Sequence, residues 1–133
     1  MRIKRPDTKD ARSLLEAAHQ EMKFTLHSLT VSEEAASTIV RNIYECFRML
    51  GDALLTWKGI ESTDHLQPIH EILKLDVHTV RPLQMIDHLR RLRHNINYYG
   101  YKPTVEEAEE AISIARSCFE AVYQKVKALI EEK

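Results

Sequence analysis

One segment of the sequence has an unbroken helical pattern, and it constrains the fold more than any other feature. Apolar residues recur there at spacings of three and four: Ala36, Ile39, Ile43, Cys46, Leu50, Ala53 and Trp57. This is the period of an α-helix that buries one face, so we predict a long helix at the seam of a helical bundle. Gly51 lies inside this helix and costs about 1 kcal/mol relative to alanine. Close approach of another helix would offset that cost.

Two helices are expected before and after this seam. The first covers residues 7–29, where Asp7 follows a proline and can serve as the N-cap. Its apolar stripe comprises Ala11, Leu14, Ala18, Met22 and Leu26 or Leu29. The last helix opens with the capping box Thr104-Val105-Glu106-Glu107, and its apolar positions continue to Leu129.

Between them, residues 59–81 form a connector with a short helix near residues 68–74. A further helix is expected from Pro82, which suits a first turn, to Asn97. Gly100 is placed to end this helix in a left-handed conformation. Its apolar stripe is Met85, Leu89, Leu92 and Ile96.

Composition is consistent with a globular helical protein. The 133 residues, of which 44% are hydrophobic and 29% charged, suit one domain over residues 1–133. The net charge of −1 excludes a generally basic nucleic-acid coat, although it leaves room for a local basic patch. No alternating β pattern is present. We therefore predict an all-α fold, an up-and-down bundle of four long helices plus a short connector helix.

We expect a cytoplasmic protein that does not contact a membrane. No stretch approaches the length of about 20 apolar residues that a membrane span needs. The polar beginning of the sequence lacks the apolar core of a signal peptide. Cys46 and Cys118 fall within apolar stripes, where a buried thiol is the expected state.

No cofactor or metal is expected. Glu16-Ala17-Ala18-His19 has the E-x-x-H spacing, but di-iron bundles need two such motifs and the sequence has one. His65, His70 and His78 lie in the connector at spacings of five and eight, which fit no helical pair of ligands. We interpret these three as histidines that face solvent.

The segment with the strongest functional signal is residues 90–101, RRLRHNINYYGY. On a helix, Arg90, Arg93 and Asn97 lie along one polar stripe. Arginine binds phosphate through two parallel hydrogen bonds, and tyrosine can stack on bases. In a continuous helix Tyr98 points about 140° away from Arg93, so cooperation between them requires the helix to fray. The alternative is an ordinary basic helix end whose tyrosines pack the turn.

At these residues the sequence resembles the HEPN family (higher eukaryote and prokaryote nucleotide-binding domain). Members carry an arginine, a polar residue and, a few positions later, a histidine, at the end of the helix before the final long helix. Arg93 and His94 match the first two positions. Residues 53–61, ALLTWKGIE, with Asp64 and His65, resemble the family's second-helix end and Lys-Gly turn. The resemblance extends from about residue 35 to the C-terminus and implies a helical homodimer.

In active family members, the resemblance implies metal-independent RNA cleavage by attack of the 2′-hydroxyl on the adjacent phosphate. Arginine would stabilise the phosphorane and histidine would move protons. Here Tyr98 stands at the histidine position, or Tyr99 if the spacing is one residue longer, and tyrosine has a pKa of about 10 against about 6.5 for histidine. The candidate catalytic residues are therefore Arg93, His94 and Tyr98. The candidate RNA- or nucleotide-binding residues are Arg90, Asn97 and Tyr99.

Three functions remain open. The first, which we place slightly ahead, is an endoribonuclease, the toxin of a pair whose antitoxin is a minimal nucleotidyltransferase. The second is a non-catalytic module of the same fold that binds a nucleotide or a protein partner, as the tyrosine at position 98 suggests. The third is a purely structural bundle in which Arg93 is surface charge.

Overall fold

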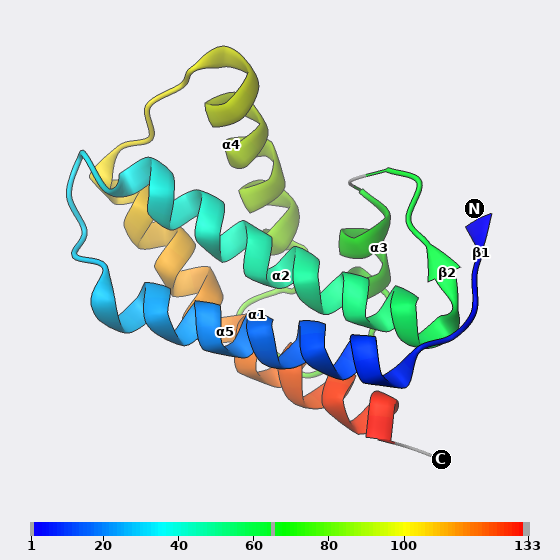
Figure 1. Ribbon diagram of the computed structural model, residues 1–133. Coiled ribbons are helices and arrows are strands. Elements are labelled where there is room, and N and C mark those ends of the chain that lie inside the picture. The colour runs from blue at the N-terminus through cyan, green and yellow to red at the C-terminus, as the bar shows by residue number, and fades with distance from the viewer. Residues whose placement is uncertain (1, 65, 132–133) are drawn as a thin grey trace.

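The computed structural model describes residues 2–64 and 66–131, and in this part the chain forms five helices and one short pair of strands (Figure 1). The elements are β1 (Arg2–Ile3), α1 (Thr8–Ser28), α2 (Ala36–Lys58), β2 (Ile60–Glu61), α3 (Gln67–Leu73), α4 (Met85–Tyr99) and α5 (Val105–Glu131). The prediction of an all-α protein is confirmed. The antiparallel pairing of β1 with β2 was not predicted, because two residues are too few to show alternation.

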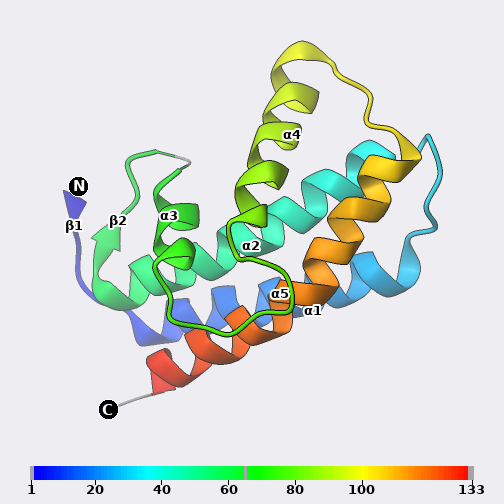
Figure 2. The same ribbon diagram turned by 180° about the vertical axis from the view of Figure 1, so that it is seen from behind.

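Helix α2 is the central element of the molecule. In both views α1 and α5 lie on one side of it, and α3 and α4 lie on the other (Figures 1 and 2). The predicted seam is buried from Ala36 to Ala53, and Trp57 is partly buried. Further buried residues of α2 include Val40, Tyr44, Phe47 and Leu54. Helix α2 contacts all four other helices, and these contacts bury it on more than one face.

At Gly51 the backbone of α3 closely approaches α2. A Cβ atom at this position would lie 2.0 Å from the carbonyl oxygen of Pro68, far inside van der Waals contact. Glycine therefore permits an approach that any other residue would block. The expectation that a second helix compensates for this glycine is confirmed.

The ends of α1 and α5 are capped as predicted. The backbone N–H of Asp10 donates to the carboxylate of Asp7 at 2.9 Å. Thr104 Oγ1 accepts from the N–H of Glu107 at 3.1 Å, and the Glu107 carboxylate accepts from the N–H of Thr104 at 3.0 Å. One position of the α1 stripe was wrong, because Leu15 is the fully buried leucine and Leu14 is only partly buried.

Helix α4 differs from its predicted bounds of Pro82 to Asn97 at both ends, although Gly100 terminates it as predicted. Residues 82–84 form a turn, in which the N–H of Met85 donates to the carbonyl of Pro82 at 3.0 Å, and the α-helix begins only at Met85. Gly100 ends it in the left-handed conformation, with φ 64° and ψ 23°. The helix is continuous to Tyr99. It packs chiefly on α2, and its C-terminal end extends away from α1 and α5 (Figures 1 and 2).

Several other expectations can be compared with the described residues. Cys46 and Cys118 are buried free thiols, as predicted. His70 and His78 are exposed, as predicted, whereas His65 lies outside the described residues. Within the described ranges, no helix combines the length and the apolarity that crossing a bilayer requires.

Candidate functional site

Arg93 projects from α4 toward α2. Its guanidinium carbon lies 5.5 Å from the centre of the Tyr44 ring, within the range of a cation–π contact. Burial raises the pKa of Tyr44, and the positive charges of Arg93, Arg48 and Arg90 partly oppose that rise. Among the described residues, no carboxylate forms an ion pair with Arg93. Its positive charge is thus met by the Tyr44 ring and by no described carboxylate.

The two other arginines of α4 differ from Arg93 because they share a carboxylate. Arg90 Nε donates to Asp87 Oδ1 at 2.7 Å, and Arg91 Nε lies 3.6 Å from Asp87 Oδ2. The hydrogen bond from Arg90 is the main reason that the pKa of Asp87 is lowered. Arg90 was predicted to bind RNA or a nucleotide, yet in the structure its charge is compensated within its own helix.

His94 and the two tyrosines at the end of α4 form a second group, which we call the aromatic tip (His94, Tyr98 and Tyr99). The ring centre of His94 lies 4.7 Å from that of Tyr98 and 5.7 Å from that of Tyr99. Tyr98 is 62% exposed and Tyr99 75% exposed, although tyrosine is an amphipathic residue that usually buries much of its ring. Asn97 is also exposed.

The structure thus separates the predicted site into two faces of one helix. His94, Tyr98 and Tyr99 lie together, whereas Arg93 lies over Tyr44. The helix does not fray before Gly100, where the N–H of Tyr101 donates to the carbonyl of Asn95 at 3.1 Å. The condition under which Arg93 and Tyr98 of one chain would act together is therefore not met.

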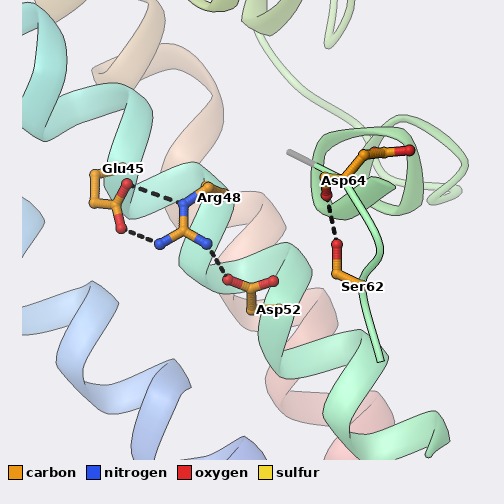
Figure 3. Close-up of polar contacts among 5 residues, drawn as sticks. All are labelled: Glu45, Arg48, Asp52, Ser62 and Asp64. Carbon is orange, nitrogen blue, oxygen red and sulfur yellow. Dashed lines mark hydrogen bonds and ion pairs between the residues drawn. The ribbon is translucent and has the colours of Figure 1, made fainter. Parts of the chain in front are cut away.

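A polar cluster on α2 was missed by the sequence analysis. The Arg48 side chain lies between Glu45 and Asp52 and forms ion pairs with both (Figure 3). Burial raises the pKa of Asp52, although Arg48 opposes the rise. The positions of Glu45, Arg48 and Asp52, three and four residues apart, are the signal that could have revealed these pairs.

The loop before α3 faces this cluster across a hollow of about 270 Å³. Ser62 Oγ donates to the carbonyl of Asp64 at 2.5 Å (Figure 3). The Asp64 carboxylate accepts from the N–H groups of Leu66 and Gln67 at 2.9 and 2.8 Å. Asp64 therefore satisfies backbone donors at the start of α3. These contacts give the cluster and the loop a structural role.

The E-x-x-H residues of α1 also have structural partners. Tyr123 of α5 donates its hydroxyl to Glu16 at 2.9 Å. His19 Nε2 lies 3.3 Å from a Glu120 carboxylate oxygen, and its ring stacks on Tyr123 with centres 4.0 Å apart. These contacts join α1 to α5. In the described part of the chain, no three His, Cys, Asp or Glu side chains are grouped so that they could hold a metal ion.

The chain was compared with protein-family models, with curated proteins and with solved structures, and none of the three comparisons finds a match.

Proposed function

We propose that the C-terminal end of α4 binds single-stranded RNA, as a HEPN-like module. In this proposal Arg93 holds a backbone phosphate, while Tyr98 and Tyr99 stack on neighbouring bases. The observation that carries the proposal is the contrast among the arginines of α4. Arg90 and Arg91 pair with Asp87, whereas Arg93 has no carboxylate partner among the described residues.

The chemistry of the aromatic tip supports this ligand. An exposed tyrosine offers a flat face to any base, and stacking of this kind contributes about 1–3 kcal/mol per base. Sequence-specific contacts are not required, because every base has a face that can stack. The separation of Arg93 from the tip suits a strand that passes around the end of the helix, with phosphate on one side and bases on the other.

Binding to RNA is placed ahead of cleavage for a geometric reason. Cleavage requires a group that stabilises the phosphorane and a group that moves protons at the same phosphate. Within one chain, Arg93 points toward α2 and His94 lies with Tyr98 on another face. Tyr98 and Tyr99 are exposed and Arg93 is half-buried, so the side chains that suit binding reach the surface, but those that suit catalysis do not converge.

Fluorescence anisotropy with a labelled single-stranded RNA, in buffer without metal, tests the proposal. Hydrogen bonds to charged groups contribute about 1.5–3 kcal/mol, so Arg93→Ala is expected to weaken binding about tenfold or more. Tyr99→Ala is expected to weaken it about fivefold or more through lost stacking. Arg91→Ala, on the same helix and exposed, is the matched control and should change the affinity little. Equal effects of Arg93→Ala and Arg91→Ala would refute this assignment, and absence of any saturable binding would favour a purely structural bundle.

RNA cleavage is the second candidate, and the contact between His94 and Tyr98 favours it. These exposed side chains can both carry protons, and in the HEPN-like homodimer that we predict a second copy would supply Arg93. Metal-free incubation with excess protein tests the candidate. Cleavage that is lost in both Arg93→Ala and His94→Ala would support it, and absence of products at enzyme excess would remove it.

A minimal nucleotidyltransferase as antitoxin remains part of the proposal for a cleaving toxin. The exposed tip of α4 gives such a partner an accessible surface. Co-purification of a nucleotidyltransferase encoded beside this protein, with binding reduced by Tyr98→Ala, would support the pairing. Separate elution of the two proteins at micromolar concentration would exclude a stable complex.

A further inference from the structure

Arginines gather around Tyr44 of α2, and they differ in whether a carboxylate neutralises them. Burial raises the pKa of the Tyr44 hydroxyl, and three nearby guanidinium groups oppose that rise: Arg93, Arg48 and Arg90. Arg48 forms ion pairs with two carboxylates of its own helix, and Arg90 forms one with Asp87. Of these three arginines, Arg93 alone has no carboxylate partner in the described part of the chain.

A fourth arginine, Arg41, precedes Tyr44 by three residues on α2. Residues three apart on a helix lie on the same face, with Cβ atoms about 5–6 Å apart. Arg41 is exposed, and among the described residues no carboxylate forms an ion pair with it. Arg93 lies 5.5 Å from the centre of the Tyr44 ring. Two arginines without carboxylate partners, one on each helix, therefore lie next to the same tyrosine.

The acidic residues closest to Arg41 along the chain do not neutralise it. Glu45, four residues later, has the spacing of an ion-pair partner, but Arg48 donates to both oxygens of its carboxylate. Glu33 and Glu34 precede α2 and lie seven or more residues before Arg41. Arg41 is therefore left unpaired because Arg48 already occupies the carboxylate within its reach.

The facing parts of α2 and α4 have an excess of positive charge. Residues 41–52 and 85–99 contain five arginines and three carboxylates, with histidine counted as neutral, whereas the whole chain has a net charge of −1. The three carboxylates form ion pairs with three of these arginines and balance them in number. On neighbouring elements, the carboxylates of Glu71 and Glu107 accept hydrogen bonds from their own partners. The excess of two charges therefore belongs to Arg41 and Arg93.

We propose that Arg41 and Arg93 hold neighbouring phosphates of one single-stranded RNA, so that the strand continues from the end of α4 onto α2. This inference rests on the proposed function and extends its binding site to a second helix. Phosphate suits these side chains, because the donors of a guanidinium group match its oxygens. An acidic protein segment suits the surface less well, because it offers no bases to the tyrosines of the aromatic tip.

The salt dependence of affinity tests the proposal, because each phosphate contact with a single strand adds about 0.7 to the slope of log K against log salt. We would measure the anisotropy of a labelled oligouridylate. Arg41→Gln and Arg93→Gln should each reduce the slope by about 0.7, and the double variant should reduce it by about 1.4. Arg41→Gln should also weaken binding about fivefold to tenfold in about 50 mM salt, whereas Arg41→Lys keeps the charge and should keep the slope.

Arg12→Gln is the matched control for loss of one positive charge. Arg12 is an exposed arginine of α1 without an ion pair among the described residues, and α1 lies on the other side of α2 from α4 (Figures 1 and 2). Its substitution should leave the slope unchanged. Circular dichroism would verify that each variant is folded.

The outcomes separate this inference from the proposed function. If Arg93→Gln weakens binding while Arg41→Gln behaves like Arg12→Gln, the inference is overturned and the proposed function stands. A double variant with the slope of either single variant would also overturn it, because the two arginines would then share one phosphate. Polyglutamate that binds more tightly than RNA of equal charge would overturn it in favour of an acidic protein. Absence of saturable RNA binding would overturn both.

Discussion

The guanidinium group of Arg93 lies over the ring of Tyr44, 5.5 Å from its centre, so a residue of the polar stripe of α4 contacts the central helix. Helix α4 packs mainly on α2 and has few contacts with any other element. The Arg93–Tyr44 pair is therefore part of the contact that holds α4 in place. The attachment orients the arginine, whose hydrogen-bond donors meet no carboxylate in the described part of the chain. It can be measured separately from any ligand.

A double-mutant cycle should detect this coupling. Tyr44→Leu and Arg93→Ala are expected to show an interaction energy of about 0.5–1 kcal/mol in urea unfolding, the size of a cation–π contact near a surface. Tyr44→Leu alone should cost more, because Tyr44 is 1% exposed and its loss leaves a cavity. The cycle of Tyr44→Leu with Arg91→Ala is the control, and an equal coupling there would contradict the contact.

Gly51→Ala should destabilise the protein although it places alanine in a helix. Elsewhere this change would gain about 1 kcal/mol, but here the new methyl group would meet Pro68, and overpacking costs about 1–3 kcal/mol or more. A net loss of about 2 kcal/mol in the free energy of unfolding is expected. Gly100→Ala separates backbone strain from crowding. A Cβ atom at position 100 would have open space, but the alanine would have to adopt a φ of 64°. A rise in thermal midpoint for Gly51→Ala would show that α3 does not approach so closely.

Glu71 should make stability depend on pH in the acid range. It is 8% exposed and accepts from Lys58 Nζ and Lys74 Nζ, each at 2.9 Å. Burial alone would raise the pKa of Glu71, but the two lysines outweigh it and lower the pKa. Its contribution is therefore present above the unfolded-state pKa of about 4.3 and is lost as the pH falls through the lower folded value.

The variant Glu71→Gln tests this dependence. At pH 7 it should cost about 1–3 kcal/mol in urea unfolding, because two lysines lose a buried charged acceptor. The difference from the unsubstituted protein should shrink as the pH falls below about 4. Glu106→Gln, at an exposed position of α5, controls for the loss of a surface carboxylate. A difference that stays constant from neutral to acid pH would contradict the sign of the shift.

The turn between α4 and α5 should respond to loss of its capping box. Thr104→Ala is expected to cost about 1 kcal/mol in unfolding free energy, because the N–H of Glu107 loses its acceptor. Tyr101→Phe should cost about 0.5–1.5 kcal/mol through the lost hydroxyl bond to Glu107. The two effects should not add, since both act on Glu107, Thr104 through its backbone N–H and Tyr101 through its carboxylate. Strict additivity would mean that Tyr101 and Thr104 act independently.

The sequence was sufficient to predict the helices because their apolar period and end signals agree. Asp7, Gly100 and the Thr104–Glu107 box lie where the structure places helix ends. Two details were missed, one local and one that depends on packing between helices. Pro82 begins a turn that precedes α4, and the choice between Leu14 and Leu15 depends on how α1 is rotated against α2.

The candidate site was less accessible to sequence analysis for a similar reason. Periodicity correctly separates Arg93 from Tyr98, and the helix continues to Gly100 as a left-handed terminus predicts. The apolar period alone does not show which arginines of α4 pair with a carboxylate. Asp87 lies three residues before Arg90 and four before Arg91, so this ion pairing was visible in the spacing. The position of Arg93 over Tyr44 could not be predicted, because it depends on how α4 packs against α2.

The projecting end of α4 also affects how this protein can change over generations. Tyr98 and Tyr99 are largely exposed, and the buried core ends on α4 at Ile96. Substitutions at exposed positions usually alter folding free energy by less than about 0.5 kcal/mol, so residues 97–99 can vary almost independently of the rest of the chain. Natural selection can thus alter the surface of this helix end while the remaining scaffold stays the same.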